Sequence, residues 1–125
     1  MDCPNCGTEM LTFTVPEDMR DHADSDDVGF CPRCLTTAPS ERGGDSDFSR
    51  VSDAFPGGCG GAAMALALGK LDSLALNRAD IEGLLEAAER EGVDPMLLID
   101  RLAAQGNVRP AFDIDRRRHQ IEQLL

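Results

Sequence analysis

Four cysteines near the start of this 125-residue chain form the pattern best suited to chemistry. Two residues separate Cys3 from Cys6, two separate Cys31 from Cys34, and 24 residues lie between the pairs. Zinc binds four thiolates in a tetrahedron, and a two-residue spacer lets one tight turn present both sulfurs of a pair to the same ion. The spacing therefore predicts one structural Zn²⁺ held by Cys3, Cys6, Cys31 and Cys34.

The residues beside the cysteines suit such turns, or knuckles. Pro4 and Pro32 follow the first cysteine of each pair, and proline presets the φ angle that the turn needs. Gly7 follows Cys6 and permits a left-handed backbone, which lets amide groups point at the thiolate. The second knuckle has Leu35 at the matching position, so the turn argument is looser there.

Other uses of these cysteines fit less well. A thioredoxin-like redox pair opens a helix after a strand, whereas Cys3 stands near the first residue with no strand pattern before it. We see no signal peptide and therefore expect a cytoplasmic protein with reduced thiols rather than disulfides. A closed four-cysteine site offers no open coordination position for catalysis.

The elements that must position the cysteines are short strands. Residues 10–15 alternate in type and predict a strand, while residues 28–30 lead into the second pair and residues 35–38 lead away from it. We therefore predict a small β zinc ribbon over residues 1–40. Residues 41–58 are rich in Gly, Ser, Asp and Pro and are interpreted as a linker whose three apolar residues are able to dock on a neighbouring surface: Phe48, Val51 and Phe55.

The remaining residues, 59–125, predict a helical domain, so the fold class is α+β with a C-terminal bundle of about four helices. The first helix is apolar on most sides, which suits a central, buried position, and its apolar surface favours a dimer or a partner if the bundle leaves part of it uncovered. Caps and stops give the expected bounds: 62–76, 77–91 with Asn77 as cap, 96–105 after Asp94-Pro95, and a fourth helix opened by Asp113 or Asp115.

The charge has an unusual composition. Acidic residues number 23 against 12 basic ones, the net charge is −11, and Lys70 is the single lysine. Aspartate adds charge with little apolar surface, and at about 1 M salt the Debye length is only ~3 Å, so repulsion among many carboxylates is screened. We therefore expect adaptation to a salt-accumulating cytoplasm.

These features together resemble the small, acidic zinc-finger proteins of haloarchaea, which carry the Cys-Pro-x-Cys-Gly knuckle. The resemblance rests on residues 3–7 and extends to residues 71–76, 92–95 and 116–118. It is a likeness to a haloarchaeal zinc-ribbon family of uncharacterised function. It implies zinc ligands at the four cysteines and no catalytic residue.

Four further features are weaker candidates. Cys59 lies between two Gly-Gly pairs, where a thiol could be redox-active or a small hinge residue, and the glycines lack the rest of a phosphate-binding loop. His22 and His119 have no nucleophile placed beside them by any recognisable pattern. The one basic cluster could bind phosphates, but consecutive helical residues spread around the helix and acids surround them: Arg116, Arg117 and Arg118.

The sequence therefore favours a non-enzymatic interaction or regulatory adaptor, bound to a protein partner or to a second copy of itself. Nucleic-acid binding in transcription or translation is the second hypothesis. Against it stand eight acids and two arginines in residues 1–40, and five Phe with no Trp or Tyr to stack on bases. No apolar run approaches the ~20 residues of a membrane span, so we expect no membrane contact.

Overall fold

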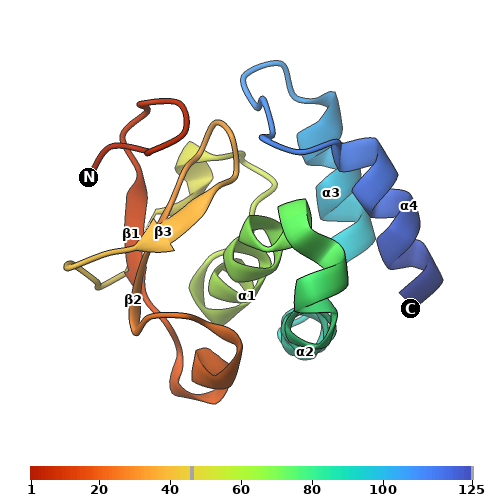
Figure 1. Cartoon of the computed structure of the whole chain (residues 1–125), viewed down its shortest axis with the longest axis horizontal. Coiled ribbons are helices and arrows are strands. Elements are labelled where there is room, and N and C mark those ends of the chain that lie inside the picture. The colour runs from red at the N-terminus through yellow and green to blue at the C-terminus, as the bar shows by residue number, and fades with distance from the viewer. Residues whose placement is uncertain (46, 125) are drawn as a thin grey trace.

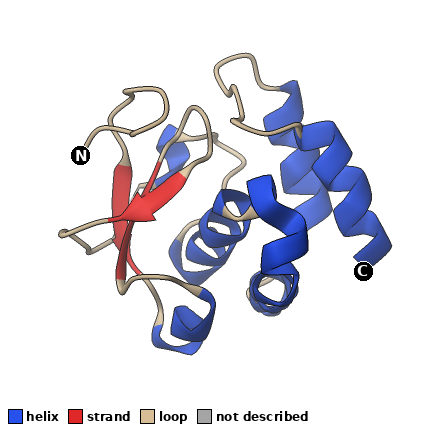
Figure 2. Ribbon diagram, viewed as in Figure 1, coloured by secondary structure: helices blue, strands red, loops and turns tan. Residues whose placement is uncertain are grey.

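A three-stranded antiparallel sheet precedes a set of helices, which confirms the α+β class (Figures 1 and 2). The computed structural model describes residues 1–45 and 47–124. The strands are β1 (Leu11–Thr14), β2 (Asp27–Phe30) and β3 (Thr37–Pro39), in the order β1-β2-β3. The α-helices are α1 (Gly58–Gly69), α2 (Leu74–Arg90), α3 (Pro95–Ala104) and α4 (Ile114–Leu124), and short 3-10 turns form η1 (Glu17–His22), η2 (Phe48–Arg50) and η3 (Leu71–Ser73).

The register of the sheet brings both cysteine pairs to one end. Leu11 at the start of β1 pairs with Phe30 at the end of β2, and Phe30 pairs in turn with Thr37 at the start of β3. The first knuckle precedes β1 and the second lies between β2 and β3, so both turns lie at the same end of the strands. Leu11 and Phe13 are buried as their alternation predicts.

Helix α1 is the centre of the fold and lies between the sheet and α2 (Figure 1). Its residues from Gly60 to Leu68 are all buried, as expected for a helix that is apolar all round. Gly61 permits a close approach, because a Cβ there would lie 2.3 Å from the Pro56 carbonyl oxygen and 2.7 Å from the Phe48 ring. The chain thus covers this helix with its own side chains.

The predicted boundary between the first two helices was wrong. The first helix ends at Gly69 rather than Leu76, a turn at η3 follows, and α2 begins at Leu74, before Asn77. Gly69 lies against Thr37, whose Oγ1 would be 2.2 Å from an added Cβ, so contact with β3 fixes this end of α1. The Asn77 side chain does not cap α2; its Nδ2 donates to the Lys70 carbonyl at 3.4 Å.

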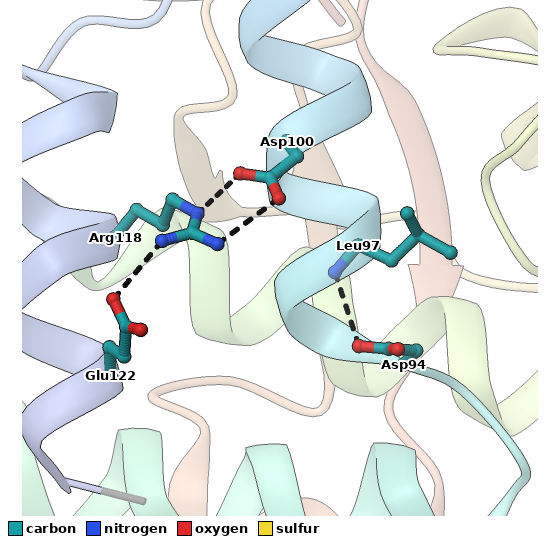
Figure 3. Close-up of polar contacts among 5 residues, drawn as sticks. All are labelled: Asp94, Leu97, Asp100, Arg118 and Glu122. Atoms are coloured by element: carbon teal, nitrogen blue, oxygen red, sulfur yellow. Dashed lines mark hydrogen bonds and ion pairs between the residues drawn. The ribbon is translucent and has the colours of Figure 1, made fainter.

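The caps predicted for the last two helices are present. The Asp94 carboxylate accepts from the Leu97 amide at 3.1 Å, before Pro95 in the first turn of α3 (Figure 3). Asp113 rather than Asp115 opens α4, because its Oδ1 accepts from the Arg116 amide at 3.1 Å. Both caps are local in sequence, and for this reason the residue pattern located them.

The segment between the sheet and α1 packs into the core. Phe48, Val51 and Phe55 are at most 6% exposed, which confirms that these three apolar residues dock on a neighbouring surface. The Phe48 ring lies 5.5 Å from the Phe13 ring of β1, and the Phe55 ring lies 5.9 Å from the Phe30 ring of β2. One hydrophobic cluster therefore draws residues from the sheet, this segment and the helices.

Among the described residues, no single helix is long and apolar enough to span a membrane. Together, the segments Gly58–Gly69 and Leu71–Arg90 reach the length and apolar composition of a span, but they are bent by 42° at the break between them.

Candidate metal centre

The four predicted cysteines converge at the end of the sheet. Their Sγ atoms all lie within 4.8 Å of one another, with Cys3 3.5 Å from Cys34 and Cys6 3.5 Å from Cys31. A tetrahedral site with Zn–S bonds of ~2.3 Å separates its sulfurs by about 3.8 Å. The spacing of the four sulfurs therefore fits one tetrahedral ion, and four soft thiolates form a donor set that zinc prefers.

Both knuckles have the same backbone turn. The Gly7 amide donates to the Cys3 carbonyl at 2.9 Å, and the Leu35 amide donates to the Cys31 carbonyl at 3.1 Å. Gly7 has φ +79° and Leu35 has φ +64°, so each turn closes on a left-handed residue. Leu35 is the one non-glycine residue with positive φ in the described part of the chain.

Leu35 corrects the expectation of a looser second turn. Its side chain is 0% exposed and belongs to the main hydrophobic core rather than to the cysteine cluster. A left-handed leucine costs roughly 1–2 kcal/mol of backbone strain, while burial of its side chain contributes a larger stabilisation, about 1.5–3 kcal/mol. The second knuckle is thus anchored in the core by the residue that closes it.

Two threonines lower the pKa of one thiol in each cysteine pair. The Thr8 hydroxyl lies 3.3 Å from Cys6 Sγ, and hydrogen bonds from Thr8 lower the pKa of Cys6 to about 6. Burial raises the pKa of Cys34, but hydrogen bonds together outweigh burial and lower it; the strongest of these involve Thr36, whose hydroxyl lies 3.1 Å from the sulfur. Each threonine therefore supports a thiolate, the form that binds metal.

The other two thiols are held in their neutral form. Burial raises the pKa of Cys31 to about 12 and also raises the pKa of Cys3. A metal ion reverses this preference because it replaces the proton on each ligand. The site therefore combines two thiols whose pKa is lowered with two whose pKa is raised by burial.

Comparison with models of protein families identifies the family of this chain. The model of a family of unknown function, DUF6276, matches residues 2–125. The chain belongs to the DUF6276 family. No curated protein and no solved structure matched it. In this DUF6276 chain, the four clustered cysteines form a possible metal site consistent with a zinc ribbon.

The loop between α3 and α4 covers the second knuckle of the DUF6276 chain. The Arg109 amide donates to the Arg33 carbonyl at 2.6 Å, and the Ala111 amide donates to the Cys34 carbonyl at 3.0 Å. Neither contact was predicted. Backbone groups make both of them, so no side-chain type in the sequence marks the positions that meet.

The weaker candidates lie outside the cluster. Cys59 is exposed at the second residue of α1, and His119 is exposed on α4. His22 lies against α2 instead, with its Nδ1 3.1 Å from Asp80 Oδ1 and its ring where a Cβ on Gly83 would be. The imidazole therefore helps to hold η1 on α2.

The three consecutive arginines do not form one basic patch. Arg118 bonds to Asp100 of α3 and, at 3.2 Å, to Glu122 of α4, so it joins the two helices (Figure 3). Arg117 donates to Gln120 at 2.8 Å and to the Asp72 carbonyl at 3.1 Å. Of the three, Arg116 alone is exposed without an ion pair to a described residue.

Proposed function

We propose that this DUF6276 chain is a non-enzymatic cytoplasmic protein, stabilised by one Zn²⁺, that acts as an adaptor or regulatory module by binding another protein. The four cysteines would hold the ion, which would fix the two knuckles to each other. With all four coordination positions filled by thiolates, such an ion has no position left for a substrate. Its role would be to hold the surface around the knuckles in shape.

The observation that carries the proposal is apolar surface on the helices. Leu76 on α2 is 88% exposed and Leu97 on α3 is 48% exposed. Helix α1, from which the sequence suggested an uncovered surface, is buried within the chain. The exposed leucines of α2 and α3, rather than α1, therefore support binding of a partner. Burying a leucine side chain contributes about 1.5–3 kcal/mol.

We also propose that the protein works at high salt, as the haloarchaeal resemblance implies. The support is the net charge of −11 with one lysine. That lysine is 9% exposed and lies 3.8 Å from the carboxylates of Asp24 and Asp80. The exposed positively charged side chains are therefore arginines.

Size-exclusion chromatography of the tagged protein tests the adaptor proposal, because a chain without Trp or Tyr absorbs little at 280 nm. The protein would be purified in molar KCl from a salt-accumulating host and followed at 215, 260 and 280 nm. We expect a larger species that absorbs at 280 nm and dissociates in a Leu76→Ser, Leu97→Ser variant. A monomer without absorbance at 280 nm, or a species bright at 260 nm and lost after nuclease, would contradict the proposal.

A further inference from the structure

An open polar groove lies between the segment after η2 and the C-terminal end of α3. Its volume is about 470 Å³. Arg50 lines one side and Arg101 the other, and Gln105 fixes the two sides by donating to the Val51 carbonyl at 2.7 Å. The groove therefore presents two guanidinium groups on a hydrogen-bonded framework.

Two more arginines are close to this groove along the backbone. Asn107 lines the groove, and Arg109 follows two residues later in the loop that covers the second knuckle. The backbone bond of 2.6 Å from Arg109 to Arg33 places these two arginines next to each other. We call the set the arginine surface: Arg33, Arg50, Arg101 and Arg109.

These arginines are grouped together in a chain that has 23 acidic and 12 basic residues. Arg33, Arg101 and Arg109 are exposed and have no ion pair with a described residue, and Arg50 has only a Coulombic interaction with Asp47. One acid, Asp53, also lines the groove. Carboxylates within 4.0 Å pair with the single lysine and with three other arginines: Lys70, Arg20, Arg78 and Arg118. The four other arginines also have no ion pair with a described residue, so the arginine surface is distinguished by the grouping of its members around one groove and one backbone contact. The arginine surface thus keeps a local excess of positive charge.

A second groove continues from the first toward an exposed leucine. It has a volume of about 380 Å³, shares Ala54 and Arg101 with the polar groove, and includes Leu97 and Val93. Of its two acids, Glu91 and Asp94, the second is engaged in the cap of α3 (Figure 3). Arg101 therefore stands between a polar, arginine-lined groove and an apolar one.

We infer that the arginine surface binds an acidic segment of a partner protein, whose carboxylates face the four arginines and whose apolar residue covers Leu97. This inference rests on the proposed adaptor function and names the chemistry of its partner. Guanidinium groups bind carboxylates through paired hydrogen bonds. Nucleic acid fits less well because a single strand needs aromatic side chains to stack on, and four of the five Phe are buried and the fifth, Phe112, is half-buried.

Fluorescence anisotropy with defined probes tests the inference. The first probe is a fluorescein-labelled 12-residue peptide of alternating Asp and Ala with a central Leu, and the second carries Asn for each Asp. The third is a 12-nucleotide dT oligomer. Binding is measured with the zinc-loaded full chain at the lowest KCl concentration that keeps its far-ultraviolet helical signal, because salt screens charge pairs.

We expect the Asp peptide to bind and the Asn peptide to bind at least about tenfold more weakly. The double variants R33Q/R109Q and R50Q/R101Q should each weaken Asp-peptide binding by about fivefold or more. The matched control R42Q/R78Q removes the same charge from the loop after β3 and from α2, and should stay within about twofold of the wild type.

Three results would overturn the inference: no binding of the Asp peptide, equal binding by all three double variants, or tighter binding of the dT oligomer than of the peptide. The chromatography described above separates this failure from failure of the adaptor function. If a protein partner still co-elutes with both arginine-surface variants, the adaptor function stands and the partner binds elsewhere. If no protein co-elutes with the wild type, the adaptor function itself fails.

Discussion

At the residue scale, Leu35 shows how one position serves both the candidate metal site and the core. Its backbone has φ +64° and closes the second knuckle, and its side chain is fully buried. The sequence predicted that these four cysteines would cluster, because the two-residue spacing within each pair is local. It did not reveal that Leu35 would take the same left-handed turn as Gly7, since that depends on a core assembled from distant residues.

The Leu35→Gly substitution separates the effect of backbone strain from the effect of side-chain burial. If the turn alone mattered, glycine would relieve roughly 1–2 kcal/mol of strain and stabilise the fold. We expect the opposite, a net loss of about 2–3 kcal/mol, because removing a buried leucine side chain costs more than the strain. Urea unfolding followed by circular dichroism measures the change, and a more stable variant would refute this view of Leu35.

Metal binding should release protons in a number that the thiol pKa values set. At pH 7, Cys31, with a pKa of about 12, and Cys3, with a raised pKa, hold their protons, whereas Cys6, with a pKa of about 6, is mostly ionised. We therefore expect at least two protons released for each Zn²⁺ bound, and zinc affinity that rises with pH. Titration of metal-free protein in a weakly buffered indicator solution counts them, and fewer than two would contradict the assignment.

At the element scale, local signals were sufficient for some boundaries and not for others. Asp94-Pro95 located the start of α3 because cap and helix are adjacent in sequence. The break after Gly69 was missed because it arises where α1 meets Thr37 of β3. The contact between the α3–α4 loop and the second knuckle was missed for the same reason, since backbone groups from distant segments form it.

The packing of α1 predicts a strong effect of one methyl group. Gly61→Ala raises helix propensity by about 1 kcal/mol, yet the added Cβ would lie 2.3 Å from the Pro56 carbonyl oxygen. We expect a net destabilisation of about 1–3 kcal/mol from the forced movement. Gly57→Ala is the matched control, because a Cβ there meets nothing within 4 Å; equal stability of the two variants in urea would show that α1 is not packed this closely.

At the scale of the whole molecule, repulsion among the acidic groups opposes folding. The net charge of −11 is spread over 125 residues, and salt shortens the Debye length from ~8 Å at 0.15 M to ~3 Å at 1 M. We therefore expect the melting temperature to rise steadily with KCl into the molar range. Thermal melts followed by circular dichroism check this, and highest stability in dilute buffer would exclude adaptation to high salt.

The central claim is that Cys3, Cys6, Cys31 and Cys34 hold one zinc ion that shapes the surrounding surface. Native mass spectrometry of the full chain, purified with zinc and then desalted, tests it most directly. We predict one Zn²⁺ per chain, retained in Cys59→Ser and lost or strongly reduced in Cys31→Ser. A folded chain without metal, or zinc held equally well by Cys31→Ser, would contradict the account.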